Sequence, residues 1–227
     1  DAVLALRQPG ELAPTVAKPH QPLFRIGLKC FFEEGRALAR VNHPNVVRIL
    51  NFFRANETVY MVMAYESGHS LQEHVARVVG KGSRLNERFV RKVFTGVCHG
   101  LREVHANKLL HLDLKPANIY LRSDGSPILL DFGAARQAIN KDLPMLAPMY
   151  TPGFAPPELY ARGAPLGPWS DIYSIGAALF ACMSGAPPQA ADARANEDKL
   201  PAHFARIEGA YSPELVDVVR ACLALDP

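Results

Sequence analysis

The sequence predicts an α+β fold in two lobes, a small β-rich lobe over residues 1–66 and a larger helical lobe over residues 67–227. Three observations predict this division. Residues 46–53 and 58–65 are apolar, β-rich runs separated by four residues, which is the pattern of a hairpin. Gly68 then interrupts the chain. The long segments that follow have helical rather than alternating periodicity.

The composition indicates a folded protein with a substantial core. Of the 227 residues, 48% are hydrophobic and 21% are charged, as in ordinary globular proteins. The net charge of +3 is too small to require a nucleic-acid or membrane partner. No apolar run reaches the ~18 residues needed to cross a bilayer, and no signal peptide opens the chain. We therefore expect a cytoplasmic protein, or the cytosolic domain of a larger, membrane-anchored one, without nucleic-acid or membrane contacts from this segment.

The cysteines are far apart and form no CxxC pair, so reduced and buried thiols are expected rather than disulfides or a zinc site. They are Cys30, Cys98, Cys182 and Cys222.

The small lobe begins with an apolar run, AVLAL at residues 2–6, whose composition is consistent with a buried strand. Residues 8–22 contain four prolines and are expected to form a loop. Residues 28–41 are predicted to be helical, because apolar residues recur there at helical spacing and Pro44 follows.

The large lobe is predicted to contain several helices. Residues 71–79 form a short one, and Asn86 is a plausible N-cap for the next. Residues 170–185 are apolar nearly all round, with a Ser cap in front, which indicates a helix buried in the core. Residues 188–200 form a polar segment, and Ser212 with a following proline opens a final helix to about Leu223. The helix after Asn86 carries one apolar stripe: Val90, Val93, Phe94, Val97, Leu101 and Val104.

Between these helices, His111 to Gly133 reads HLDLKPANIYLRSDGSPILLDFG and concentrates the residues that suggest chemistry. Asp113 is a candidate base for orienting a hydroxyl. Lys115, two residues on, can place a positive charge on the same side of an extended loop. Asn118 and Asp131 supply the hard oxygen ligands that Mg²⁺ prefers. Together they offer what phosphoryl transfer from ATP requires.

An Asp-Gly pair at residues 124–125 predicts that the segment between the two candidate metal ligands folds as a hairpin. A hairpin brings its ends together, so both ligands would face one site. Each residue alone is a weak signal, because a lone Asp or Asn in a loop is usually a turn or cap residue. The pattern HxDxKxxN followed by a hairpin and DFG is much more specific.

These motifs resemble the eukaryotic-like Ser/Thr protein kinase family, especially its bacterial members, over nearly the whole chain. HLDLKPAN resembles the catalytic loop, DFGAAR the metal-binding segment, TPGFAPPELY the substrate-docking loop and SDIYSIGAALF the buried helix. FFEEGRALARVNHPNVVRIL and VYMVMAYESG resemble the regulatory helix and the hinge. The resemblance implies a two-lobed protein-kinase-like fold and transfer of the ATP γ-phosphoryl group to protein hydroxyls, with ATP and Mg²⁺ as cofactors. Lys115 and Thr151 match the Ser/Thr rather than the Tyr pattern.

The resemblance also implies a set of nucleotide-binding residues. Glu34 takes the place of the ion-pairing Glu of the regulatory helix. Met63 takes the gatekeeper position, and the backbone from Ala64 to Glu66 would hydrogen-bond adenine. Tyr120 is expected to belong to the same nucleotide site.

Other positions are implied to be structural. His111 would join a packed column with Phe132 and Leu38. Asp171 would anchor the catalytic loop. Glu158 stands in the APE motif, whose usual Arg partner would lie beyond the last residue of the sequence.

The chain departs from the family pattern at the small-lobe Lys that holds the α and β phosphates. Aligning PGELA with its relatives puts Ala5 at that position. Lys18 is an alternative, and an unrecognised arrangement is another. Lys29 is too close to Glu34 to lie on a separate strand. With Ala5 in this place the phosphates lose a charge, so we expect a kinase-dead form. We interpret it as an engineered Lys→Ala change, because the other catalytic residues are intact.

Further departures lie in the Gly-rich loop and the activation loop. The Gly-rich phosphate-covering loop is absent, and the lobe is expected to be incomplete at its start. Leu112 replaces the usual Arg of His-Arg-Asp, which receives an activation-loop phosphate in relatives. No Ser or Thr occurs from Asp131 to Tyr150. We therefore expect a kinase that is not switched by phosphorylation of that loop.

Two other functions remain as alternatives. A pseudokinase that serves as a scaffold or nucleotide-binding module is favoured by Ala5 and opposed by the intact catalytic residues. A small-molecule kinase shares part of the pattern, but Lys115 and the docking loop oppose it. The expected partners are protein substrates.

Overall fold

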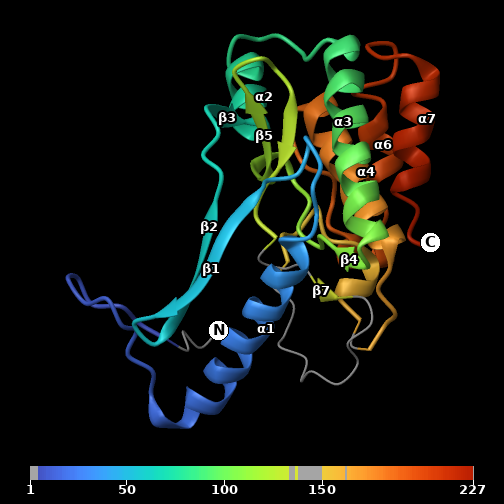
Figure 1. Cartoon of the computed structure of the whole chain (residues 1–227). Helices are drawn as coiled ribbons and strands as arrows, with labels where there is room; N and C mark the ends of the chain where they lie inside the picture. The colour runs from blue at the N-terminus through green and yellow to red at the C-terminus, as the bar shows by residue number, and fades with distance from the viewer. Residues whose placement is uncertain (1–4, 133–135, 138–149, 162, 227) are drawn as a thin grey trace.

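The computed structural model describes residues 5–132, 136–137, 150–161 and 163–226. One long helix and a two-stranded ribbon form the small lobe, below and to the left of the helical lobe in Figure 1. Helix α1 spans Gln21–Leu38, β1 spans Ile49–Ala55 and β2 spans Thr58–Met63.

The predicted hairpin of the small lobe is confirmed. β1 and β2 pair antiparallel with Ala55 opposite Thr58. Asn56 and Glu57 form a two-residue turn with φ values of 50° and 54°. Positive φ at both central residues matches the right-handed twist of the two strands.

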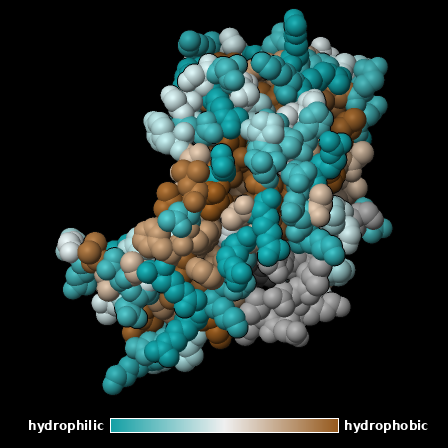
Figure 2. All heavy atoms as spheres, in the orientation of Figure 1, coloured by the Kyte–Doolittle hydropathy of each residue, from teal (hydrophilic) through white to brown (hydrophobic). Residues whose placement is uncertain are grey.

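The ribbon packs on α1 through aromatic rings. The Phe52 ring lies 6.3 Å from Phe31 and 5.9 Å from Phe32, between ring centroids. A Cβ built on Gly35 would overlap the Phe52 ring, so the glycine makes room for it. Several apolar side chains of the ribbon are exposed, and Figure 2 shows apolar side chains gathered over it. They are Leu50, Phe53, Val62 and Met63.

Helix α1 begins earlier and ends sooner than residues 28–41, so the predicted bounds are wrong. A 3-10 helix, η1, spans Lys18–His20 and leads directly into it. Pro22 lies in the first turn of α1, where no backbone donor is required, so the proline does not prevent helix formation. Val41 is buried although it lies beyond the helix.

The expectation of a buried strand at residues 2–6 is wrong for its described end. Leu6 is 58% exposed and forms a single antiparallel bridge with Thr15. Ala5 is half-buried, and residues 2–4 lie outside the described part of the chain.

The large lobe combines two small sheets with six α-helices in its described part. The three-stranded sheet has the order β3-β5-β6, and β4 pairs with β7. The strands are β3 Gly68–Ser70, β4 Leu109–Leu110, β5 Ile119–Arg122, β6 Pro127–Leu129 and β7 Arg136–Gln137. The helices are α2 Leu71–Val79, α3 Glu87–Ala106, α4 Pro168–Ser184, α5 Ala191–Asn196, α6 Leu200–Phe204 and α7 Pro213–Cys222.

Several large-lobe predictions are confirmed. Helix α2 has the predicted bounds. Asn86 caps α3, its Oδ1 accepting a hydrogen bond from the Arg88 amide at 2.8 Å. Every residue of the predicted apolar stripe on α3 is buried. Ser212 caps α7 by accepting from the Leu215 amide.

Two large-lobe predictions are wrong, and one helix lies in a segment for which none was predicted. Helix α4 starts at Pro168, and Ser170 lies inside its first turn rather than in front of it. Residues 188–200 contain α5, which is held by buried Arg194 donating to the Leu223 carbonyl and the Tyr173 hydroxyl. Gly68 does not break the chain but begins β3, where a Cβ would lie 1.9 Å from the Leu121 carbonyl oxygen.

Among the four cysteines, Cys182 is buried, Cys30 and Cys222 are half-buried and Cys98 is exposed, so the expectation that all four thiols are buried is wrong. Among the described residues, no helix combines the length and apolar character that a membrane span requires.

The segment between α1 and β1 is attached to the large lobe. Asn45 Nδ2 donates to the Pro127 carbonyl at 2.6 Å, and the Leu129 amide donates to the Asn45 carbonyl at 2.8 Å. A Cβ on Gly100 of α3 would lie 2.8 Å from that same Asn45 oxygen. The absence of a side chain at Gly100 therefore allows the segment to lie directly against α3.

Candidate active site

Buried Asp171 of α4 holds the backbone of the loop that carries Asp113. Asp171 is fully buried, and its two carboxylate oxygens accept from the His111 amide at 2.9 Å and the Leu112 amide at 2.8 Å. His105 Nε2 lies 2.7 Å from the same carboxylate. Leu112 has a φ of 62°, which costs about 1–2 kcal/mol for a residue with a side chain. The two hydrogen bonds from these amides to Asp171 hold the loop in that conformation.

His111 is enclosed beneath the loop. It is 0% exposed, and its ring centroid lies 4.5 Å from that of Phe132. Its Nε2 lies 3.1 Å from the Leu130 carbonyl oxygen. Burial lowers the pKa of His111, so the ring is neutral near pH 7 and can donate this bond. This environment is that of a packing residue rather than an acid or base.

Three polar side chains meet at Asp113. Lys115 Nζ lies 2.7 Å from Asp113 Oδ2, and the Thr151 hydroxyl donates to Asp113 Oδ1 at 2.8 Å. Lys115 Nζ also donates to Thr151 Oγ1 at 2.8 Å. Asn118 Nδ2 donates to Asp113 Oδ2 at 3.0 Å and to the Asp113 carbonyl at 2.9 Å. Residues that lie 38 positions apart in the sequence thus form one closed hydrogen-bonded set.

This arrangement already shows Asp113 receiving a hydroxyl. The Asp113 carboxylate accepts from Thr151 while Lys115 keeps a positive charge beside it. Lys115 and Asp113 are 24% and 17% exposed, so both can be reached by another molecule. A carboxylate placed in this way can orient a second hydroxyl and take its proton.

The predicted hairpin between the candidate metal ligands is confirmed. β5 and β6 pair antiparallel, and Gly125 has a φ of 77° in the turn. The Leu130 amide donates to the Asn118 carbonyl at 2.9 Å, so the residue before Asp131 is hydrogen-bonded to Asn118. Asn118 uses its side-chain nitrogen toward Asp113, and no described residue donates to its Oδ1.

These two residues fit a Mg²⁺ site of the kind that is completed by substrate. Mg²⁺ is usually held by one or two protein oxygen ligands together with phosphates and waters. The Asn118 side-chain oxygen and the Asp131 carboxylate are oxygen groups of this type. Within the described ranges, no group of three or more His, Cys, Asp or Glu side chains is arranged to hold a metal by itself.

The segment that carries Thr151 is fixed by α4 as well. The Phe154 and Ala155 amides donate to the Thr151 carbonyl at 3.0 and 3.1 Å. Ser174 Oγ donates to the Phe154 carbonyl at 2.9 Å, and Ser170 Oγ donates to Glu158. Most of the predicted long loop before it, Lys141 to Pro157, lies outside the described residues.

Among the described hydrogen bonds, none joins the residues expected to bind nucleotide to the side chains around Asp113. Glu34 lies in α1, and its side chain is outside the description. Met63 ends β2 and is 46% exposed, and the Ala64 amide donates to the Arg48 carbonyl. Tyr120 is half-buried in β5. None of the described hydrogen bonds joins Ala5 to Asp113 or its three side-chain partners.

The two lysines considered besides Ala5 for the phosphate-holding position both lie outside strands. Lys29 lies in α1, on the same helix as Glu34, as its spacing predicted. Lys18 opens η1 rather than a strand.

Sequence reasoning missed one partner of the hinge. Glu66 forms an ion pair with Arg122 of β5, with Nε 2.7 Å from Oε2. The two residues are 56 positions apart, so no local pattern could have indicated the pair.

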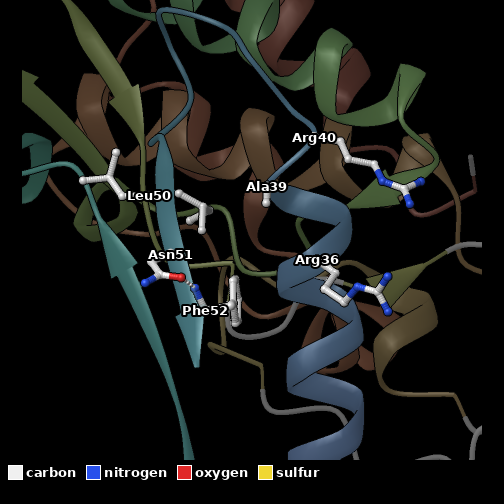
Figure 3. Close-up of a pocket in the computed structure, with 7 residues that line it drawn as sticks. Arg36, Ala39, Arg40, Leu50, Asn51 and Phe52 are labelled. Carbon is white, nitrogen blue, oxygen red and sulfur yellow. Dashed lines mark hydrogen bonds between the residues drawn. The ribbon is translucent and has the colours of Figure 1, made fainter. Parts of the chain in front are cut away.

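A pocket of about 300 Å³ lies between α1 and β1, lined by Arg36, Ala39, Arg40 and residues 49–52. Figure 3 shows Arg36 and Arg40 extending from α1 away from β1. None of the residues singled out from the sequence lines it.

Comparison with known proteins covers nearly the whole chain. Residues 18–227 match the family model described as protein kinase domain, which leaves Ala5 outside the match. A solved structure described as PpkA-294 in its apo form is similar with a TM-score of 0.79 and 33% identity, over 98% of this chain and 77% of that one.

Curated relatives are serine/threonine-protein kinases. Serine/threonine-protein kinase B of Synechocystis is 31% identical over 201 residues, 84% of this chain and 34% of that protein. PknK of Mycobacterium tuberculosis is 33% identical over 195 residues, 85% of this chain and 17% of that protein. Human serine/threonine-protein kinase H1 is 31% identical over 205 residues, which is 88% of this chain and 46% of that protein. The chain therefore spans less than half the length of these relatives.

Proposed function

Because the chain belongs to the protein kinase family, we propose that it transfers the γ-phosphoryl group of ATP to serine or threonine hydroxyls of a protein substrate. The contact between Asp113 and the Thr151 hydroxyl carries this proposal, because it demonstrates a carboxylate oriented to accept from a hydroxyl beside a lysine.

Each residue of the set has a role in the proposed reaction. Asp113 orients the acceptor hydroxyl and takes its proton as the oxygen attacks phosphorus. Lys115 places positive charge beside the transferred group, where negative charge gathers. Thr151 holds both side chains in position and borders the docking loop. Asn118 and Asp131 would hold Mg²⁺, which neutralises phosphate charge when it is bound.

The nucleotide is proposed to bind at the hinge. Adenine would lie against the backbone from Ala64 to Glu66, near Met63 and Tyr120. Glu34 would contribute from α1. We also propose that the lobes divide between residues 66 and 67, with the nucleotide between them.

In the proposed assignment, the absence of a lysine at position 5 abolishes phosphoryl transfer by this form. Ala5 occupies the position of the phosphate-holding lysine, and we propose that this form is kinase-dead through an engineered Lys→Ala change. A pseudokinase is the second candidate, and the same Ala5 favours it. The coding sequence of the natural protein distinguishes them, because a codon for Ala at this position contradicts engineering.

A phosphotransfer assay on the Ala5→Lys form tests the function. Radiolabelled ATP is offered with a protein acceptor and, separately, with small alcohols and aminoglycosides. We expect transfer to protein serine or threonine, and a loss of at least about 100-fold in Asp113→Asn, since a general base contributes about 10²–10⁴-fold. Transfer to neither acceptor contradicts the kinase and favours the pseudokinase, whereas transfer to small molecules alone contradicts the protein substrate.

Regulation by activation-loop phosphate is not expected. Leu112 is buried and has no charge to receive a phosphate. The loop between Asp131 and Tyr150 falls largely outside the described residues. Phosphopeptide mapping of the active Ala5→Lys form would contradict this proposal if activity required a modified residue there.

A further inference from the structure

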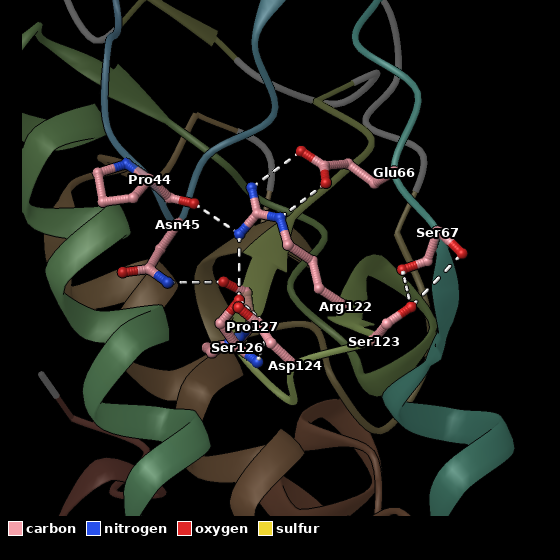
Figure 4. Close-up of polar contacts among 9 residues, drawn as sticks. All are labelled: Pro44, Asn45, Glu66, Ser67, Arg122, Ser123, Asp124, Ser126 and Pro127. Carbon is pink, nitrogen blue, oxygen red and sulfur yellow. Dashed lines mark hydrogen bonds and ion pairs between the residues drawn. The ribbon is translucent and has the colours of Figure 1, made fainter.

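Arg122 joins three segments that meet at the hinge (Figure 4). Its Nε and Nη2 donate to the two carboxylate oxygens of Glu66 at 2.7 and 2.9 Å. Its Nη1 donates to the Pro44 carbonyl at 2.8 Å. Glu66 lies between β2 and β3, Pro44 lies between α1 and β1, and Arg122 ends β5. One guanidinium thus contacts the small lobe, the hinge and the large lobe.

The geometry is that of a strong pair. Two parallel N–H···O bonds fix both partners in orientation as well as in distance. Arg122 and Glu66 are only 23% and 24% exposed, so solvent screens their attraction less than that of a surface pair. The bonds from Arg122 lower the pKa of Glu66, and the bonds to Glu66 raise the pKa of Arg122. Both groups therefore stay charged across the neutral range.

The neighbouring backbone is tied to the same place. The Ser123 amide donates to the Ser67 carbonyl at 3.1 Å, and Gly68 is the strand partner of Arg122. At the other end of the hinge segment, the Ala64 amide donates a hydrogen bond to the Arg48 carbonyl. Within the described residues, the Glu66 side chain is the contact that fixes the residue between these two attachments.

We propose that Arg122 is a positioning residue for nucleotide binding, which holds the backbone from Ala64 to Glu66 in the conformation that receives adenine. This inference rests on the proposed function. Arg122 itself touches no reacting group and acts through Glu66 and Pro44. Loss of its guanidinium would free the hinge without altering the set around Asp113.

Two measurements on purified protein test this role in Arg122→Gln. The first is hydrogen–deuterium exchange of the amides at residues 64–68 without nucleotide, where we expect about tenfold faster exchange. The second is titration with MgATP, in which Kd should rise about tenfold if the competent conformation falls to about a tenth of the population. Both are repeated in the Ala5→Lys form, where KM for ATP should rise more than kcat falls.

Arg220→Gln is the matched control. It removes another Arg–Glu pair, in which Arg220 Nη2 lies 3.0 Å from Glu208 Oε1, far along the chain from the hinge. We expect it to leave exchange at residues 64–68 and the MgATP Kd unchanged. Arg122→Lys, which keeps the charge but not the two parallel bonds, should recover only part of the affinity.

A double-mutant cycle with Glu66→Gln separates the mechanism from general destabilisation. If Arg122 acts through Glu66, the double variant should bind MgATP about as well as Arg122→Gln alone. Unchanged exchange and Kd in Arg122→Gln, or additive losses in the double variant, would overturn the inference. If neither the chain nor its Ala5→Lys form binds MgATP before any change at Arg122, the proposed function is overturned as well, so the two failures are distinct.

Discussion

Replacing Asp171 with alanine should destabilise the protein more than any other single loss of a polar group described above. The carboxylate accepts from two buried backbone amides, those of His111 and Leu112, and both would lose their partner. Each unsatisfied buried donor costs about 1–3 kcal/mol, so the free energy of unfolding should fall by about 2–6 kcal/mol. A domain with a total of about 5–15 kcal/mol would lose a large part of its stability.

Urea denaturation followed by circular dichroism measures this loss. Asp171→Asn keeps one acceptor oxygen and should lose about half as much. Ser174→Ala is the matched control, because Ser174 is buried on the same helix one turn later and its hydroxyl contacts backbone carbonyls only. That change should cost about 1 kcal/mol or less. A loss below about 1 kcal/mol for Asp171→Ala would refute the reasoning, since it would mean that the two amides find other partners or water.

Three further changes follow from the same geometry. Thr151→Val in the Ala5→Lys form should lower kcat at least tenfold while Thr151→Ser keeps most of it, because the hydroxyl is what joins Thr151 to Asp113 and Lys115; equal rates in a phosphotransfer assay would contradict this. The Ser212 amide and hydroxyl hold the pKa of Glu87 at about 2, so its stabilising effect is complete above about pH 4.5 and is lost as the pH falls toward 2. Thermal melts should show the difference between the wild type and Glu87→Gln shrinking over that range. Gly100→Ala should lower the melting temperature by several degrees, because its Cβ would lie 2.8 Å from the Asn45 carbonyl; an unchanged melt would mean that the segment shifts freely.

Apolar periodicity, helix caps and turn residues make much of the fold predictable. The α3 stripe, its Asn86 cap and the turn at residues 124–125 depend on local sequence, and the structure confirms all three. The bounds of α1 were mispredicted because prolines were read as loop residues although Pro22 stands in the first turn, where helices accept it. Helix α5 was missed because its apolar pattern is short and buried Arg194 holds it from the side.

The site was predictable only where its residues follow a spacing. Asp113, Lys115 and Asn118 stand close together in the sequence, and the β5–β6 hairpin brings the segment before Asp131 back to Asn118. The pairing of Glu66 with Arg122 depends instead on how β3 meets β5 in three dimensions. Tertiary contacts of this kind leave no periodic trace in the sequence.

The attachment of Asn45 to β6 has a mechanical consequence for α1. The helix is joined to the large lobe beyond its C-terminal end, while its first turn lies far from that lobe (Figure 1). An 18-residue helix is about 27 Å long. A rotation of about 10° around the Asn45 attachment would therefore move the Gln21 end by about 5 Å and the Leu38 end very little. Because Phe52 packs against α1, the ribbon would be carried with it, so helix and ribbon would move together about the attachments around Asn45.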